Sequence, residues 1–377
     1  MTIERLSDLA DPRAAPCVVL KVGSALLVGA DGQPNRAWLA SLVGEIAAAA
    51  TRGQQVVVVS SGAIALGAAR LGLPKRGRGS LSDAQAAAAV GQIALAGLWS
   101  ELLGERGLTA AQLLLTVEDL EDRRRYLNAA ATLGRLLKAG AVPVINENDS
   151  VATAEIRFGD NDRLAARVAQ AAQARAVVLL SDVDGLYDRD PRQAGARLLP
   201  RIEGVTAEVH AMASGASGSG LGSGGMTSKL QAAEIATRAG IALAIVNGTH
   251  QAPLARALDQ DLGTLFVPIR RDGARKAWLG GRQRLKGTLI VDDGCARALL
   301  KGGSLLASGI TGIDGAFARG DPVAVHDGAG RPIAQGLAEY DVSDVALIRG
   351  RRSEEHAGLL GYAPRSAVIH RDQLVLL

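Results

Sequence analysis

Two segments of the sequence combine a lysine with glycine and hydroxyl residues in a pattern that suits phosphate binding. The first is Lys-Val-Gly-Ser at 21–24, directly after an apolar run, and the second is Gly-Gly-Met-Thr-Ser-Lys at 224–229, where a helical stretch begins. Each would present an ammonium group and backbone N–H groups to an anion, and the second would add the positive end of a helix. Taken alone, the segment at 21–24 could equally be an ordinary glycine-containing strand exit.

The stretch at 212–225 is rich in glycine and serine, so a flexible linker is the alternative for this region. A linker explains its first half. It does not explain the second half, where two glycines, two hydroxyl residues and Lys229 open a helix. The spacing also differs from the common nucleotide P-loop, in which glycine and lysine are adjacent. Phosphate binding at 224–229 is therefore the favoured interpretation.

Other polar segments directly follow apolar runs. Ser-Ser-Gly at 60–62 would let a substrate approach the backbone, although a serine helix cap is the favoured explanation when this segment is taken alone, and one serine can fill both roles. The four polar residues at 146–149 (Asn-Glu-Asn-Asp) are poor core material and could hold a charged amino group and an amide-sized ligand. The polar segment at 181–191, with a glycine turn and a terminal proline, suits the base and ribose of a nucleotide.

Asp160, Asn161 and Asp162 stand where another helix is predicted to begin. Aspartate is common at helix starts because it caps backbone N–H groups. Two aspartates flanking an asparagine, directly after a glycine, are more than a cap requires. These carboxylates could orient nearby lysines or hold Mg²⁺.

The elements that would position these residues alternate along the chain. Apolar runs predict strands at Cys17–Val22, Gln55–Ser60, Ala110–Leu115, Val142–Ile145, Ala176–Leu180 and Ala242–Val246. Helical stretches are predicted at Arg36–Arg52, Ile64–Leu71, Leu81–Arg106, Asp119–Ala139, Arg163–Ala172 and Thr227–Ala239. This alternation predicts an α/β fold, a three-layer αβα sandwich with a mainly parallel sheet. Ligands bind such sheets at the carboxyl ends of the strands, where the polar segments fall.

The pattern changes near residue 268. We expect a catalytic domain at 1–268, a basic linker at 269–279 and a second domain at 280–377. The second domain is predicted to be small and β-barrel-like, with one short helix at Cys295–Lys301. Its expected strands are Gly287–Val291, Gly320–His326, Pro332–Leu337, Val345–Ile348 and Ala367–His370.

Composition narrows the classes of function. Residues 1–268 carry 26 basic and 26 acidic side chains, which is not the charge pattern of a nucleic-acid-binding domain. A basic stretch near 270–286 is the only candidate for such binding, and a solvated linker explains it better. Cys17 and Cys295 are too far apart to suggest a disulfide framework or a metal site. We find no signal peptide and no apolar run of membrane-spanning length, so a cytoplasmic protein is expected.

Taken together, the motifs resemble the amino-acid kinase family. They are Lys-x-Gly-Ser at 21–24, Gly-Leu-Tyr-x-x-Asp-Pro-Arg at 185–192 and Gly-Gly-Met-x-x-Lys at 224–229. The segments at 60–64, 143–155, 159–162 and 220–229 closely resemble the glutamate 5-kinase branch, and 143–155 is the most specific of them. The tail, with Gly-Gly-Ser-Leu-Leu at 302–306 and Arg-Gly-Asp at 319–321, is similar to a PUA domain.

The resemblance implies a role for each matching residue. Lys21 and Lys229 would contact the transferring phosphoryl group, and Asp162 would hold both lysines in place. Glutamate would be bound by Ser61, Gly62, Asp149 and Asn161. ATP would be bound by Lys21, Gly23, Ser181, Asp182, Ser223, Gly224, Gly225, Met226, Thr227, Ser228 and Lys229. In the family, threonine often stands where this chain has Ser24 and Ser181.

The implied reaction is ATP-dependent phosphorylation of the γ-carboxylate of L-glutamate to γ-glutamyl phosphate, the first step of proline biosynthesis. The acceptor is already ionised at neutral pH, so no general base is needed. The difficulty is repulsion between two anions, which two lysines and the Mg²⁺ carried by ATP would relieve. No metal site made by the protein itself is expected.

The resemblance also implies partners. Proline would act as a feedback inhibitor, and a glutamyl phosphate reductase would consume the labile product. The chain would form a homo-oligomer, a dimer or a tetramer, and no membrane partner is expected.

Two alternatives remain open from the sequence. The first is a sister kinase that acts on N-acetylglutamate, aspartate or a nucleoside monophosphate. The second is an RNA-binding role through the PUA-like tail. Residues 279–377 hold 12 basic and 11 acidic side chains, and the tail is poor in aromatic residues on which bases could stack, so RNA is the less favoured partner.

Overall fold

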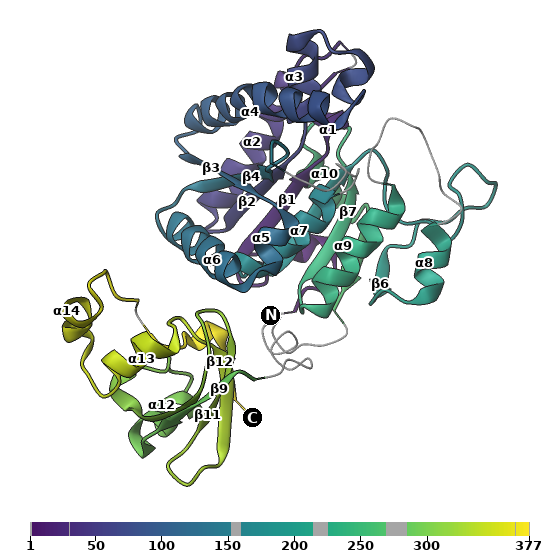
Figure 1. The fold of residues 1–377 in the computed structure, drawn as a ribbon. Coiled ribbons are helices and arrows are strands. Elements are labelled where there is room, and N and C mark those ends of the chain that lie inside the picture. The colour runs from purple at the N-terminus through teal and green to yellow at the C-terminus, as the bar shows by residue number, and fades with distance from the viewer. Residues whose placement is uncertain are drawn as a thin grey trace. The chain divides into compact units, whose positions relative to one another are not determined.

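The computed structural model describes residues 2–29, 31–151, 160–213, 225–268, 285–365 and 367–376. The chain divides into two compact units, Met1–Arg271 and Asp272–Leu377 (Figure 1). The basic linker expected at 269–279 lies outside the described residues.

An eight-stranded sheet forms the middle layer of the first unit (Figure 1). The order of its strands is β3-β4-β2-β1-β5-β7-β8-β6. All neighbours pair in parallel except β7 and β8, which are antiparallel. The strands are β1 (Cys17–Val22), β2 (Gln55–Ser60), β3 (Ala110–Leu115), β4 (Val142–Glu147), β5 (Ala176–Ser181), β6 (Arg201–Glu203), β7 (Ala242–Asn247) and β8 (Thr264–Val267).

Helices cover both faces of this sheet (Figure 1). One face carries α2 (Arg36–Thr51), α4 (Leu81–Gly104) and α10 (Pro253–Gln260), and the other carries α6 (Arg123–Lys138), α7 (Asp160–Ala171) and α9 (Met226–Arg238). The remaining helices of the unit are α1 (Ser24–Leu27), α3 (Ala63–Leu71), α5 (Val117–Glu121), α8 (Ala207–Ala213) and the 3-10 helices η1 (Leu6–Ala10) and η2 (Pro74–Gly77). The predicted three-layer αβα sandwich with a mainly parallel sheet is confirmed.

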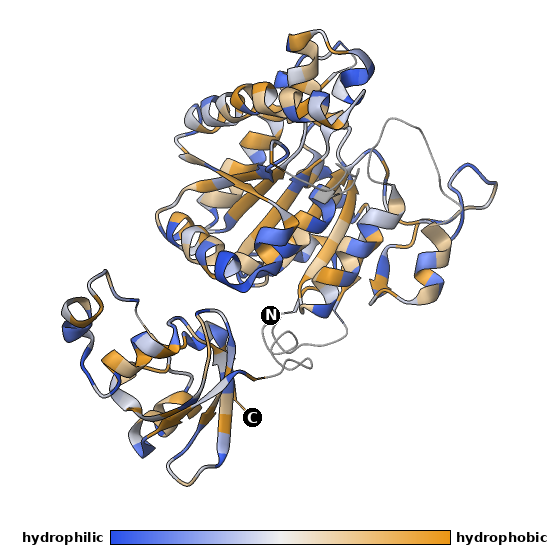
Figure 2. Ribbon diagram, viewed as in Figure 1, coloured by the Kyte–Doolittle hydropathy of each residue, from blue (hydrophilic) through white to orange (hydrophobic). Residues whose placement is uncertain are grey.

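The central strands are apolar along their length because helices bury both faces of the sheet. Figure 2 shows this as a hydrophobic interior of strands with hydrophilic residues on the outer helices. Every residue of β1 is buried, including Lys21, which is 8% exposed. A buried lysine in such a strand needs a partner for its charge.

The single helix expected at Asp119–Ala139 is wrong in detail, because the chain forms α5 and α6 there. Asp122 separates them with an extended backbone, and its side chain accepts the N–H of Arg125 as the cap of α6. Thr116 caps α5 in the same way, through the N–H of Asp119. Two capping residues six positions apart favour two short helices over one long one.

Helices α3 and α4 approach so closely that only glycine fits between them. A Cβ atom on Gly67 would lie 1.8 Å from the carbonyl oxygen of Ala87, and one on Gly91 would lie 1.8 Å from that of Ala63. Because α3 begins directly after Ser61 and Gly62, this contact fixes the end of β2 against α4.

Among the described residues, α4 is the one helix long and apolar enough to cross a membrane by length and composition alone. No apolar run of membrane-spanning length was expected from the sequence. Its residues Leu95, Trp99 and Leu103 are buried in the core of the first unit, as in a core helix of a globular domain.

The second unit is built on a five-stranded mixed sheet with the order β10-β9-β11-β12-β13. Strands β9 and β11 are parallel and the other neighbours are antiparallel. The strands are β9 (Gly287–Val291), β10 (Ile310–Gly315), β11 (Pro322–His326), β12 (Pro332–Leu337) and β13 (Leu374–Leu376). The helices are α12 (Asp293–Leu300), α13 (Val342–Ile348), α14 (His356–Leu360) and the 3-10 helices η3 (Ala307–Gly309), η4 (Ser353–Glu355) and η5 (Arg371–Gln373).

Two strands expected in this unit are wrong. The run at 345–348 belongs to α13, where Val345 and Ile348 are buried at the i, i+3 spacing of one helix face. The run at 367–370 contributes only an isolated bridge from Ile369 to Leu305, and the strand follows later as β13. Short apolar runs do not distinguish a strand from a helix by themselves.

Candidate active site

The three predicted catalytic side chains meet at the carboxyl end of β1, near the middle of the sheet. Lys21 Nζ lies 2.7 Å from Asp162 Oδ1, and Lys229 Nζ lies 3.1 Å from Asp162 Oδ2. The Asp162 side chain is completely buried, and the lysine side chains are only 10% and 8% exposed. One carboxylate therefore holds two ammonium groups side by side, and the cluster keeps a net positive charge.

Two helix N-termini strengthen that positive character. Asp162 lies in the first turn of α7, and Lys229 lies in the first turn of α9. Ser228 Oγ is 3.1 Å from Asp162 Oδ2 and 3.0 Å from the carbonyl oxygen of Gly225, so it can donate to either. Helix N-termini carry partial positive charge and unpaired N–H groups, and both favour an anion at this edge of the sheet.

Burial and charge act in opposite directions on the pKa values of the cluster. Burial alone would raise the pKa of Asp162, but the ammonium groups of Lys21 and Lys229 outweigh it and hold that pKa below 3.8. Burial lowers the pKa of Lys21 below 10.5, against the opposing charge of Asp162 and with the help of the like charge of Lys229. Asp162 is therefore an ionised acceptor, with both oxygens engaged, and is not free to act as a base.

The lowered pKa of Lys21 predicts how activity depends on alkaline pH. Since the ammonium form is the one that attracts phosphate, kcat should fall as pH rises through the pKa of Lys21, below 10.5. The measurement is kcat against pH at saturating substrates. A Lys21→Arg variant, whose guanidinium stays charged, should lose this alkaline limb in whatever activity it retains. An alkaline limb unchanged in that variant would contradict the assignment.

Two of the predicted substrate-binding residues follow β2, the neighbour of β1. The N–H of Ser61 donates to the carbonyl oxygen of Val22 at 3.2 Å, which ties this turn to the end of β1. Gly62 has a φ of 104°, a conformation that L-residues rarely adopt, and a Cβ there would lie 3.4 Å from Val28 Cγ2. The turn thus leads the chain from the sheet into α3 beside the lysine cluster.

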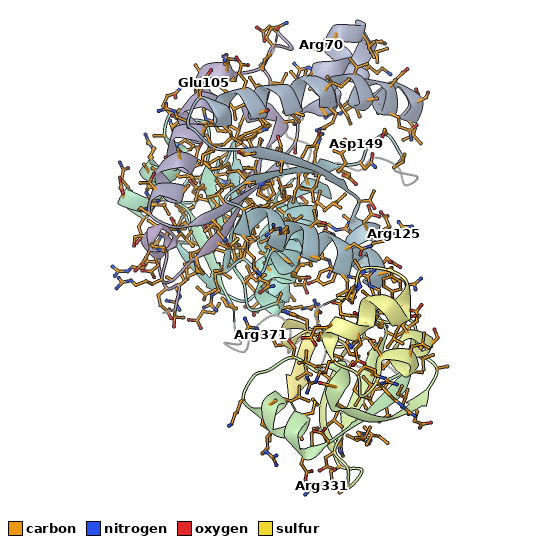
Figure 3. All side chains as sticks on the ribbon, turned by 90° about the vertical axis from the view of Figure 1, so that its left-hand side faces the viewer. Arg70, Glu105, Arg125, Asp149, Arg331 and Arg371 are labelled. Carbon is orange, nitrogen blue, oxygen red and sulfur yellow. The ribbon has the colours of Figure 1, made fainter. Side chains whose placement is uncertain are left out.

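Asp149 follows β4, which lies on the other side of β2. It is 8% exposed and lines a pocket of about 310 Å³ between α4 and the end of β4, together with Gln92, Ile93 and Glu147. Figure 3 shows Asp149 close to α4. A ligand in this pocket would meet both carboxylates and the aliphatic wall of Ile93.

The fourth predicted substrate residue, Asn161, precedes Asp162 in the first turn of α7. Its Oδ1 atom is buried and has no hydrogen-bond partner among the described residues. Buried polar atoms without partners are rare in folded proteins, and a bound ligand can supply the missing partner. An N–H donor of a substrate could satisfy this oxygen.

Predicted nucleotide-binding residues stand at the end of β5 and directly after it, and β5 is the neighbour of β1 on the opposite side from β2. Ser181 Oγ donates to Asp182 Oδ1 at 3.2 Å, and Asp182 is exposed. A Cβ atom on Gly23 would lie 3.6 Å from the carbonyl oxygen of Leu180 and 3.9 Å from Lys21 Nζ, both ordinary van der Waals distances, so Gly23 lies next to the lysine without a steric need for glycine.

The glycine-rich segment is described only from Gly225 onward. Gly225 is the N-cap of α9, and Met226 and Thr227 are its first residues, half-buried and exposed respectively. Ser223 and Gly224, also predicted to bind ATP, lie outside the described residues.

Two polar residues, Asn247 and Thr249, were not predicted from the sequence, and Asn247 contacts the predicted nucleotide-binding segment. Asn247 Nδ2 donates to Asp184 Oδ1 at 2.7 Å, and Thr249 Oγ1 donates to Asn247 Oδ1 at 2.6 Å. Asn247 and Thr249 stand at and just beyond the carboxyl end of β7, and Asp184 follows β5, the neighbour of β7 in the sheet. A signal existed, since Asn247 is the polar residue directly after the predicted strand at 242–246.

The arrangement suits transfer of a phosphoryl group to an anionic acceptor. Among the described residues, no group of three or more His, Cys, Asp or Glu side chains is placed to hold a metal ion. Mg²⁺ is commonly held by one or two carboxylates together with the phosphates of the nucleotide, and the exposed Asp182 beside the cluster is compatible with that mode of binding.

Comparison with known proteins identifies relatives of both units of the chain. Residues 16–247 match the Amino acid kinase family, and residues 287–359 match the PUA domain. A glutamate 5-kinase from Novosphingobium aromaticivorans is 67% identical over 377 residues, which is the full length of both chains. A glutamate 5-kinase from Sphingopyxis alaskensis is 58% identical and covers 98% of this chain and 100% of its own. A glutamate 5-kinase from Zymomonas mobilis is 54% identical and covers 97% of this chain and 92% of its own.

Proposed function

Because the chain belongs to the amino acid kinase family and to its glutamate 5-kinase branch, we propose that the cluster of Lys21, Asp162 and Lys229 performs the transfer step. The reaction is phosphorylation of the γ-carboxylate of L-glutamate by ATP, which yields γ-glutamyl phosphate and begins proline synthesis. The observation that carries the proposal is two buried ammonium groups on one buried carboxylate at the end of β1.

The order of strands would allow the two substrates to bind on opposite sides of this cluster. Substrate residues follow β4 and β2 on one side of β1, and nucleotide residues follow β5 and β7 on the other side. Glutamate bound near Asp149 and Ser61, and ATP bound near Ser181 and α9, would therefore meet at Lys21. Holding two anions in line in this way supplies most of the catalysis in phosphoryl transfer.

The transfer itself follows from the charges. An oxygen of the γ-carboxylate, ionised at neutral pH, forms a bond to the γ-phosphorus. The bond from that phosphorus to the bridging oxygen breaks, and ADP leaves with the electron pair. Lys21 and Lys229 reduce the repulsion between the reactants and stabilise the charge that spreads over the phosphoryl oxygens. Asp162 keeps both ammonium groups in position and takes no proton.

We propose that Mg²⁺ enters with ATP, because nucleotide phosphates are natural ligands of that ion. It would neutralise part of the phosphate charge, as the lysines do from the protein side. Asp182, exposed at the end of β5, is the described carboxylate best placed along the strand order to approach it.

The test is turnover by the purified full chain. With L-glutamate, ATP and Mg²⁺, hydroxylamine should trap the acyl phosphate as a hydroxamate in step with ADP release. N-acetylglutamate, aspartate and a nucleoside monophosphate should give far less ADP. A preference for any of those acceptors over glutamate would overturn the proposed substrate.

Asp149→Ala should raise the KM for glutamate by roughly 10-fold or more, because a charged hydrogen-bond partner of the substrate is lost. Since Asp149 lies on the substrate side of the cluster, kcat should change much less. Initial rates against glutamate concentration measure both constants. Asp259→Ala, an exposed aspartate on α10, is the matched control. An unchanged KM would remove Asp149 from the substrate site.

We also propose that the chain works as a homo-oligomer, a dimer or tetramer, in the cytoplasm. Strand β3 is an edge strand of the sheet, and nearby Ile93 and Leu114 are 75% and 37% exposed. Exposed apolar residues beside an unpaired strand edge favour association with a second copy. Light scattering should give a mass above that of one chain, and Ile93→Asp should lower it. A monomeric wild-type chain would contradict the proposal.

We also propose that proline regulates turnover and that a second enzyme consumes the product. Proline should inhibit turnover of glutamate, which an assay with and without proline measures. A glutamyl phosphate reductase should consume the product, because an acyl phosphate hydrolyses readily in water. The same assay with and without residues 279–377 would report what the PUA domain contributes.

A further inference from the structure

One face of helix α4 makes two hydrogen bonds with the ends of neighbouring strands. Trp99 Nε1 donates to Ser60 Oγ, at the end of β2, at 3.0 Å. Gln92 Oε1 accepts from Asn146 Nδ2, near the end of β4, at 2.7 Å. Gln92 and Trp99 are seven residues apart, so they lie on the same face of the helix. The close contact of Gly91 with α3 holds this face in place.

The hydrogen bond that Asn146 donates to Gln92 determines which end of the Asn146 amide is available. Asn146 is 2% exposed. Its Nδ2 group is bonded to Gln92, and its Oδ1 atom is buried without a hydrogen-bond partner among the described residues. An unpaired buried acceptor costs free energy, so it calls for a donor that a ligand could supply.

The position of Asn146 along β4 brings this residue near the residues proposed to bind glutamate. The register of β2 with β4 continues from Val58 opposite Val144, so Asn146 stands opposite Ser60. Ser60 immediately precedes Ser61, and Asp149 follows Asn146 by three residues. Of the polar groups of glutamate, only the α-ammonium group carries N–H donors, whereas its two carboxylates are acceptors.

We propose that Gln92 is a positioning residue that holds Asn146 with its oxygen toward the α-ammonium group of the substrate. This inference rests on the proposed function. It adds a specific consequence: the site recognises a free α-amino group through an acceptor that Gln92 fixes in orientation. Gln92 itself touches neither reacting atom, so it acts on substrate binding and not on the transfer step.

The test compares Gln92→Leu with Gln92→Glu. Leucine removes the acceptor for Asn146 Nδ2 and leaves the amide free to turn. Glutamate at this position keeps a carboxyl oxygen in the same place and should rescue the orientation. Gln260→Leu, an exposed glutamine on α10, is the matched control. Thermal unfolding and molecular mass of each variant establish that it is folded and assembled as the wild type is.

Three quantities are measured for each variant: kcat, the KM for L-glutamate, and the inhibition constant of glutarate, which lacks the amino group. Gln92→Leu should raise the KM for glutamate roughly 10-fold or more with kcat within about 2-fold, and Gln92→Glu should stay near wild type. The glutarate constant should not change, since that ligand offers no donor to Asn146.

Two results would overturn the inference. If Gln92→Leu weakens glutamate and glutarate equally, the residue only shapes the pocket. If Gln92→Glu is as impaired as Gln92→Leu, its hydrogen bond to Asn146 is not the cause. Failure of the proposed function is distinguishable, because it would appear as absent glutamate turnover in the wild-type chain.

Discussion

Replacing Lys21 or Lys229 by alanine is expected to lower kcat by roughly 100-fold or more. Each ammonium group is buried and held within 3.1 Å of Asp162, so it acts where little water competes for the phosphoryl oxygens. Removing a fixed positive charge from such a place weakens the transition state more than the bound ground state. Steady-state kinetics with saturating glutamate and ATP measure the effect on kcat directly.

The fold should survive either single substitution. Asp162 would still have one lysine partner, which balances its charge in the core. Lys138→Ala, at the exposed last turn of α6, is the matched control and should keep wild-type turnover. Near-normal kcat in Lys21→Ala or Lys229→Ala would refute the two-lysine mechanism, and so would an equal loss of activity in the control.

Asp162→Ala is expected to destabilise the first unit by about 3–5 kcal/mol and to abolish most activity. Its side chain is completely buried, and its removal leaves Lys21 and Lys229 facing each other with no carboxylate between them. Urea unfolding of wild type and variant measures the loss of unfolding free energy. Asp259→Ala, which removes an exposed carboxylate from α10, is the control and should change the free energy of unfolding far less than Asp162→Ala does.

The pH dependence of the stability difference between wild type and Asp162→Ala tests whether the charge of Asp162 causes it. The pKa of Asp162 in the folded chain lies below 3.8, so its stabilising contribution is present at neutral pH. That contribution is lost as pH falls through the folded-state pKa, because the carboxylate must then take up a proton. The stability difference between wild type and Asp162→Ala should therefore shrink below about pH 4. A difference that stays constant into that range would point to packing instead of charge.

Much of the fold was predictable because its strands are short apolar runs and its helices alternate with them. The residues that end these strands were predictable as a group for the same reason, since parallel strands bring their carboxyl ends to one edge. The predictions failed where local signals compete. Asp122 ends one helix and caps the next, and Val345 and Ile348 read equally well as strand or helix.

Other features of the structure could not be predicted from the sequence. Gly67 and Gly91 are required because α3 and α4 pack so closely that a Cβ atom at either position would clash with the backbone of the other helix. The residues flanking each glycine in the sequence give no sign of this contact. Gln92 lies in the middle of a long apolar helix, and its bond to Asn146 joins residues 54 positions apart. Such pairs depend on how helices pack, which local pattern does not encode.

The sequence by itself determined the chemistry of the two lysine segments: each offered an ammonium group beside glycine and hydroxyl residues, a local arrangement that suits phosphate. The choice of glutamate came from resemblance at 143–155 and 159–162, and full-length relatives support it. Only the tertiary structure decided that both lysines share one carboxylate. Lys21, Asp162 and Lys229 come from three elements separated by more than sixty residues at each step, and only the parallel sheet and its helices bring their charges within 3.1 Å.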